Sequence, residues 1–194
     1  MKKTLMGSMS AAALAVVLAV PAMQAEAAAI RNANLFTTVL PANDDGSTGA
    51  QNIGFTINFF GVNFSQLFVN NNGNVTFDAP LATFTPFPLI NTPRQLLAPF
   101  FADVDTRGAG SDVVRYGQAV IDSKNVFGVN WINVGYFNSQ TNKLNSFQLI
   151  ITDRSDIAAG DFDFEFNYDQ IQWETGSASG GSNGLGGNSA RAGW

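Results

Sequence analysis

The chain has 194 residues, of which 45% are hydrophobic, 12% aromatic and only 13% charged. This composition excludes a disordered chain and predicts a single domain with one substantial core. Cysteine and histidine are both absent, which excludes disulfides, thiolate nucleophiles, histidine bases and the usual zinc and copper sites.

The first 27 residues have the pattern of a secretory signal peptide. A basic start, Met1-Lys2-Lys3, precedes an apolar run over residues 9–20 that ends at Pro21. Ala25-Glu26-Ala27 then places small residues at the two positions that signal peptidase reads. Because the apolar run is short for a bilayer span, export is favoured over the alternative of an N-terminal membrane anchor.

The charge of the mature chain limits its partners. Cleavage after Ala27 leaves 167 residues, and the loss of two lysines and one glutamate leaves 8 basic and 14 acidic groups, a formal net charge of −6. An acidic surface repels nucleic acid and anionic lipid, so we expect neither as a partner. No later segment is long and apolar enough for membrane insertion, and the product is expected to be secreted or held at the cell surface.

Residues 28–52 are predicted to form a lead-in and a first strand. Leu35–Leu40 has strand composition and ends at Pro41. In the loop that follows, Asp44-Asp45-Gly46 has two interpretations. The carboxylates could bind a hard cation, but turn chemistry is the simpler account, because Asp bonds its own backbone and Gly accepts positive φ.

Residues 53–194 are predicted to form the main β domain, which begins with hairpins. Ile53–Phe60 alternates apolar and polar residues, as a half-buried strand does. Two short strands, Leu67–Val69 and Val75–Phe77, flank the Asn-rich turn Asn70–Asn74. We favour a turn over a sugar-binding tip there, because Asn-Gly suits positive φ. Four prolines within residues 78–94 predict a loop packed over the edge of the core.

The segment Leu96–Gly108 carries the best candidate site. Phe100 and Phe101 are followed by two carboxylates two residues apart, on the same side of an extended chain. Hard cations need several oxygen ligands, and Asp103, Asp105 and Asp112 are the candidate calcium ligands, together with carbonyls of the Gly108–Gly110 turn. A structural ion pair with Arg107 is the favoured alternative, because no twelve-residue calcium loop is present.

The second half of the chain is also predicted to form strands. We expect Val113–Tyr116 to pair with Ala119–Ile121, and Val126–Val134 to be a central strand. Phe147–Thr152 is a further strand. Since no stretch of the mature chain keeps a 3.6-residue apolar period, the predicted fold class is all-β. The expected architecture is a two-layer antiparallel β-sandwich of many short strands with long Pro-rich and Gly-rich loops.

The strand Asp161–Phe166 alternates carboxylates with phenylalanines. Its carboxylates could suggest a glycosidase, which uses a carboxylate pair across the scissile bond. A solvated strand face is favoured instead, because mature glutamates are limited to Glu165 and Glu174. Nucleophilic triads are excluded without histidine or cysteine, so no enzyme is predicted.

Six sequence blocks, in order over Phe55–Trp194, resemble the nidogen-like extracellular (NIDO) domain, and the chain is identified as a secreted bacterial member of that family. The blocks are Phe60-Gly61, Val69–Gly73, Ala98–Arg107, Asn130–Tyr136, Asn145–Leu149 and Phe166–Gly176. Phe101 stands where the family usually has Trp. Family members continue past the segment Ala190–Trp194 into a final strand, so we expect this domain to be truncated at its C-terminal end.

The resemblance implies a non-enzymatic module of cell–matrix adhesion, found in nidogen, tectorin and related matrix proteins, with no catalytic residues to transfer. Its partner would be an extracellular protein or a glycan. The alternative is a lectin-like, carbohydrate-binding module that stacks aromatic rings on sugars. The candidate sugar-stacking rings are Trp131, Tyr136, Phe137 and Trp173, although aromatic residues in strands belong to the core more often. No cofactor is expected apart from the candidate calcium ion.

Overall fold

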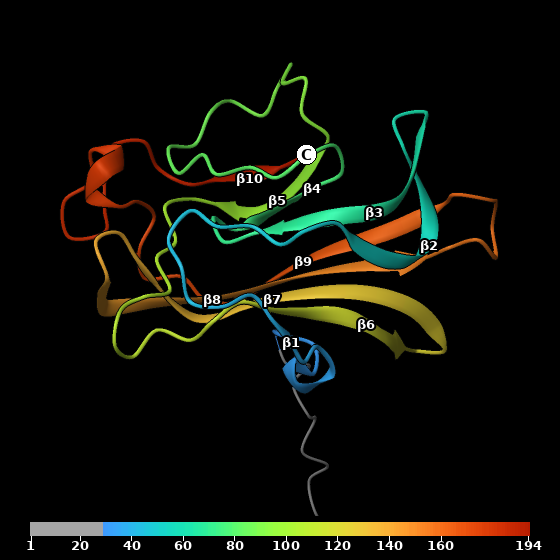
Figure 1. Ribbon diagram of the computed structural model, residues 1–194, viewed down its shortest axis with the longest axis horizontal. Helices are drawn as coiled ribbons and strands as arrows, with labels where there is room; N and C mark the ends of the chain where they lie inside the picture. Colours follow the sequence, from blue (N-terminus) through green and yellow to red (C-terminus); the bar gives the residue numbers. More distant parts are fainter. Residues whose placement is uncertain (1–28) are drawn as a thin grey trace, which may run out of the picture.

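The computed structural model describes residues 29–194, and the predicted signal peptide lies outside the described residues. Two five-stranded antiparallel sheets pack face to face as a sandwich, with β3, β4, β5 and β10 above β6, β7 and β8 in Figure 1. The first sheet has the order β1 (Thr38–Val39), β6 (Arg115–Ile121), β7 (Lys124–Tyr136), β8 (Gln140–Asp153) and β9 (Phe162–Gln170). The second has the order β10 (Arg191–Gly193), β5 (Leu96–Phe101), β4 (Asn74–Thr76), β3 (Val62–Asn70) and β2 (Gln51–Phe59).

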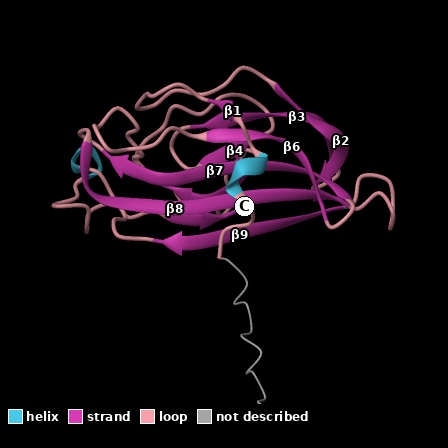
Figure 2. Cartoon of the chain, turned by 90° about the horizontal axis from the view of Figure 1, so that it is seen from below, coloured by secondary structure: helices cyan, strands magenta, loops and turns pink. Residues whose placement is uncertain are grey.

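The all-β prediction is confirmed. The helical segments of the described residues are two 3₁₀ turns, η1 (Ala33–Leu35) and η2 (Ser177–Ser179), and the rest of the regular structure in Figure 2 is strand. No helix within residues 29–194 has the length and hydropathy that a bilayer crossing requires.

The core lies between the two sheets, because alternating strands send their apolar side chains to the same layer. β2 buries Ile53, Ile57 and Phe59, half-buries Phe55 on the same face, and exposes Gly54, Thr56 and Asn58, as the alternation predicted. β7 is the central strand of its sheet, as predicted, and its Trp131 is fully buried. The Trp131 ring stacks on Phe147 of β8, with 5.2 Å between the ring centroids.

The first strand is shorter than predicted. Leu35–Leu40 was expected to be extended throughout, but η1 includes Leu35 and β1 is limited to Thr38–Val39. The reason is Phe36, which turns onto the outer face of the first sheet and packs there with Val126 and Ile150. A Cβ on Gly128 would lie only 2.0 Å from the Phe36 ring, so the glycine makes room for this contact.

A second correction concerns β6. Val113–Tyr116 and Ala119–Ile121 were expected to pair with each other, but Arg115–Ile121 is one continuous strand. It pairs along its length with β7, from Arg115 opposite Asn130 to Ile121 opposite Lys124. The glycine between the two predicted segments, Gly117, resembles a turn residue in sequence; here it lies within the strand at φ 153°.

Loops cover the outer face of β5. The Pro-rich segment 78–94 has no strand or helix, as predicted, and its Leu81, Phe87 and Leu89 pack against Leu96, Ala98 and Phe101. Phe100 belongs to the inner core and Phe101 to this outer cluster, so the two neighbouring rings anchor β5 on both faces. β10 pairs with β5 and places Arg191 opposite Phe101.

Candidate carboxylate site

Three segments meet at the end of β5. They are the loop over residues 41–49, the turn over residues 70–74 and the segment over residues 102–107. Backbone hydrogen bonds join them: the Asn71 N–H donates to Gly46 O at 2.9 Å, and the Thr106 N–H donates to Asn43 O at 2.9 Å. The site is therefore built from parts of the chain that are far apart in sequence.

The Asn-rich turn is the buried frame of this site. Asn70, Asn71, Asn72 and Asn74 are each at most 1% exposed. The Asn71 side-chain amide donates to the Asp44 and Val104 carbonyls, each at 2.6 Å. The turn interpretation is confirmed, and the sugar-binding alternative for these asparagines is wrong, because their amides are buried and bonded within the protein.

Gly73 sets the geometry of the turn. It has φ 73°, a left-handed conformation that suits glycine. A Cβ there would lie 1.8 Å from the Phe100 carbonyl oxygen, so there is no room for a side chain between the turn and β5. Its own carbonyl accepts a hydrogen bond from the Phe100 N–H at 3.2 Å. The turn is thus fastened directly to the strand that leads into the acidic segment.

Asp105 forms the predicted ion pair. Its carboxylate is fully buried and accepts two hydrogen bonds from the Arg107 side chain, Nε to Oδ1 at 2.9 Å and an Nη to Oδ2 at 2.6 Å, and a third from the Arg107 backbone N–H at 3.0 Å. The Ser139 N–H also donates to it, at 2.8 Å. Burial opposes the charged form, but the hydrogen bonds from Arg107 and Ser139 hold the Asp105 pKa below its usual value. This carboxylate is paired within the protein.

Asp103 has no such pairing. Its side chain is 1% exposed, and its Oδ2 has no hydrogen-bond partner among the described residues. Burial, reinforced by the charges of Asp44, Asp45 and Asp105, raises the Asp103 pKa to about 7. The backbone nevertheless holds the residue firmly, because its carbonyl accepts from the Phe137 N–H at 3.2 Å.

Asp44 shares this environment. One of its oxygens accepts from Arg107 at 2.9 Å, while the other, Oδ1, is buried without a partner. Burial, with the charges of Asp105 and Asp45, raises the Asp44 pKa to about 6. Beside it, Asp45 Oδ1 accepts from the Asn72 amide at 2.8 Å.

The structure groups the acidic residues differently from the sequence prediction. In the described part of the chain, Asp44, Asp45 and Asp103 each offer a carboxylate oxygen, and these atoms lie within 4.8 Å of one another. Asp105 and Asp112 are not in this group. Asp105 is engaged by Arg107, and the Asp112 carboxylate accepts instead from the Asn133 amide at 3.4 Å. The Asp-Asp-Gly turn was the sequence signal for Asp44 and Asp45.

The aromatic residues considered for sugar binding do not form an exposed platform. Trp131, Tyr136 and Trp173 are at most 3% exposed. Both indole N–H groups are bonded internally, Trp131 to Asn71 O at 3.0 Å and Trp173 to Val134 O at 3.1 Å. Phe137 is half-buried. Trp131, Tyr136 and Trp173 therefore belong to the core and are not available to stack on a sugar.

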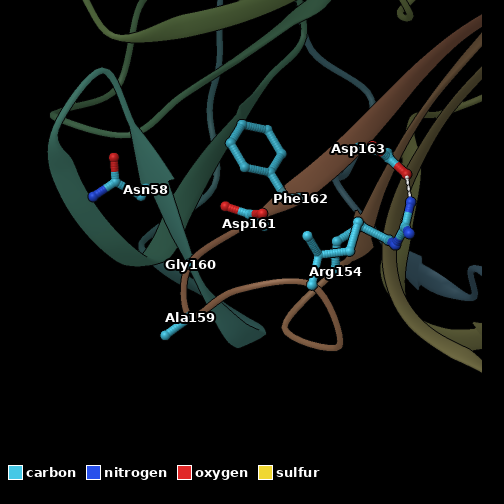
Figure 3. Close-up of a pocket in the computed structure, with 8 residues that line it drawn as sticks. Asn58, Arg154, Ala159, Gly160, Asp161, Phe162 and Asp163 are labelled. Atoms are coloured by element: carbon cyan, nitrogen blue, oxygen red, sulfur yellow. Dashed lines mark hydrogen bonds and ion pairs between the residues drawn. The ribbon is translucent and has the colours of Figure 1, made fainter.

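The carboxylates of β9 line the solvent-facing side of their strand, as predicted. Asp163 is exposed and pairs with Arg154 beside a hollow of about 280 Å³ (Figure 3). In that view the Arg154 side chain runs to Asp163 and away from Asn58. Arg154 also pairs with Asp156, and Arg31 pairs with Glu165. Of the carboxylates on this face, Asp163 and Glu165 are therefore paired with arginines.

Comparisons with known proteins give a consistent set of relatives. Residues 65–194 match the Nidogen-like domain family, NIDO. Human alpha-tectorin is 36% identical over 182 residues, and chicken alpha-tectorin is 34% identical over the same length; both alignments cover 81% of this chain. Fruit-fly nidogen is 31% identical over 119 residues, 49% of this chain. The chain spans 8–9% of the length of these relatives. No solved structure matches it significantly.

Proposed function

Because the chain belongs to the nidogen-like domain family, we propose that it is a secreted, non-enzymatic module that binds a component of the extracellular matrix. The observation that carries the proposal is the similarity to alpha-tectorin, which extends over 81% of the chain. The matched region is 8% of the human protein, so the activities of the full-length relatives are not assigned to this chain. The proposal concerns the module alone, acting through its surface.

The arrangement of charged and aromatic residues supports binding without chemistry. The buried Asp105 is held by Arg107, and Asp163 and Glu165 of β9 are paired with arginines at the surface. A hydrolase needs an acid and a base facing one substrate, which these pairs do not supply. Cell–matrix adhesion is the proposed biological setting. Export through the N-terminal signal and a bacterial source remain predictions from the sequence.

We propose a protein partner over a glycan partner. A lectin-like module requires exposed rings beside hydrogen-bonding groups, and three of the four candidate rings are buried. Trp173→Ala would therefore disturb the core and would not report on sugar binding. The class of partner therefore has to be determined by altering the matrix and not the chain.

The experiment is a binding assay of the exported chain on extracellular matrix laid down by cultured cells. One matrix sample is treated with protease, a second with a mixture of glycosidases, and a third is left untouched. We expect binding to the untouched and deglycosylated samples and loss of binding after proteolysis. Loss after glycosidase treatment would instead establish the carbohydrate-binding alternative, and equal, non-saturable retention on all three would contradict a specific matrix module.

A further inference from the structure

We propose that Asp44, Asp45 and Asp103 bind one calcium ion. These three carboxylates come from two segments separated by 58 positions, and each offers an oxygen within 4.8 Å of the others. The ligand set differs from the one expected from sequence, since it includes the Asp-Asp turn and leaves out Asp105 and Asp112. The site does not depend on the identity of the matrix partner.

The first argument is the unpaired state of buried oxygens. Asp103 is 1% exposed, and its Oδ2 has no hydrogen-bond partner, although its carboxylate lies with two others. Asp44 Oδ1 is in the same condition. Native structures rarely leave buried polar atoms unsatisfied, and a buried charge is normally paired or bound to a metal. A cation among the three carboxylates would supply the missing partner.

The acidic cluster also has an excess of negative charge. Within residues 29–194, the cluster of Asp44, Asp45, Asp103 and Asp105 has one cationic neighbour in ion-pair contact, Arg107, which engages Asp105 and one oxygen of Asp44. Three negative charges are left without a counter-charge. A divalent ion removes most of that excess, and Arg107 stays with the carboxylate that is not a ligand.

The ligand atoms indicate which kind of ion would bind. All three groups present carboxylate oxygens, which are hard ligands that suit calcium or magnesium. Two ligands on opposite sides of calcium lie about 4.6–5.2 Å apart, whereas the small magnesium shell spans about 4 Å. The present separations, at most 4.8 Å, lie within the span of a calcium shell. Backbone carbonyls and water would complete a shell of 6–8 oxygens.

The frame around the carboxylates is already organised. The Asn72 side-chain N–H donates to Asp45 Oδ1 at 2.8 Å. The Asn72 Oδ1 accepts from the Val104 N–H at 3.0 Å. The Asp103 Oδ2 lies under Gly176, where a Cβ would approach it to 2.4 Å. Positioning of this kind reduces the ordering cost of binding. The ion would therefore fasten the 41–49 loop to the end of β5.

The experiment is calorimetric titration of the mature, chelator-treated chain with calcium chloride alone, followed by the same titration with magnesium chloride. We expect one calcium site with a dissociation constant of about 10⁻⁴–10⁻³ M, the range of extracellular modules, and weaker binding of magnesium. Asp45→Asn should weaken calcium binding at least tenfold. This variant keeps the size of a half-buried side chain, so the fold should persist, which circular dichroism would check.

Asp112→Asn is the matched control. It removes one carboxylate that is outside the three-residue group, and calcium affinity should change less than twofold. Absence of saturable calcium binding to the folded chain would overturn the proposal. Equal affinities for Asp45→Asn and the unmodified chain would also overturn it, as would a loss of binding in Asp112→Asn as large as that in Asp45→Asn.

Discussion

At the scale of single residues, two neighbouring aspartates have opposite electrostatic environments. Asp105 is stabilised in its charged form by Arg107 and the Ser139 N–H, whereas Asp103 is equally buried and its Oδ2 has no hydrogen-bond partner. The sequence shows only two carboxylates at a spacing of two. The difference between them arises from residues 44, 45 and 139, which approach through the fold.

This contrast explains how much of the site the sequence could predict. The ion pair of Asp105 with Arg107 was predictable because the two residues are local. The grouping of Asp103 with Asp44 and Asp45 was not, because it depends on how the 41–49 loop docks against the Asn-rich turn. Asp112 was included on sequence proximity, and the structure directs it to Asn133 instead.

The stability of the calcium-free protein should fall as the pH rises from about 4 to about 7. The pKa values of Asp103 and Asp44 are raised to about 7 and about 6, so over this interval the folded state binds more protons than the unfolded chain. Their contribution to stability is full below the unfolded aspartate pKa and is lost as the pH passes the folded values. Thermal melts in chelator at several pH values check this.

The matched variant for the pH series is Asp103→Asn. It replaces the group with the higher pKa by a neutral side chain of similar size, so the decline between pH 5 and 7 should become shallower. A melting temperature that rises over the same interval in the unmodified chain, or a slope unchanged by the substitution, would contradict the environment described for Asp103.

Arg107→Ala should destabilise the protein more than removal of an exposed arginine does. It leaves the Asp105 carboxylate buried without its arginine, and the loss is smaller than for a fully buried pair because Arg107 is 44% exposed. Arg154→Ala is the control: its partners Asp156 and Asp163 are exposed, so the loss of stability should be clearly smaller. Urea unfolding measures both, and equal losses would rule out a special role for Arg107.

At the scale of elements, periodicity predicted those strands whose two faces have different environments. β2 and β9 alternate because one face packs on the core and the other meets solvent. The first strand and β6 were mispredicted for tertiary reasons. Phe36 is drawn to an outer cluster over Gly128, and Gly117 lies within a strand that β7 holds on one side. Neither reason can be seen in a local window of sequence.

The turn between β3 and β4 should tolerate no side chain at Gly73. Gly73→Ala combines strain at φ 73° with a clash against the Phe100 carbonyl, where the Cβ would lie at 1.8 Å. We expect a loss of at least about 3 kcal/mol, with β5 displaced. Chemical denaturation followed by intrinsic tryptophan fluorescence would measure it.

Gly61 is the matched control for this turn. It also has positive φ, 87°, in the turn between β2 and β3, but a Cβ there meets nothing within 4 Å. Gly61→Ala should therefore cost only about 1 kcal/mol, from backbone strain alone. Similar losses for the two alanines would show that the close approach of Gly73 to β5 is unimportant.

At the scale of the whole molecule, the fold and the family were predictable, but the exposure of individual aromatic rings was not. Six blocks in order indicated the family, and the matched residues 65–194 confirm it. The lectin-like alternative depended on Trp131 and Trp173 being exposed, and only the packed sandwich shows that both are core residues. What is left for function is the surface that surrounds this aromatic core.

The most direct test of the account is the equilibrium binding isotherm of the folded, exported chain on immobilised extracellular matrix protein. The account predicts saturable binding that disappears when the chain is heat-unfolded, with the matrix protein recovered intact in size. Non-saturable binding that is the same for folded and unfolded chain would contradict a matrix-interaction module, and progressive cleavage of the matrix protein by the purified chain would contradict its non-enzymatic character.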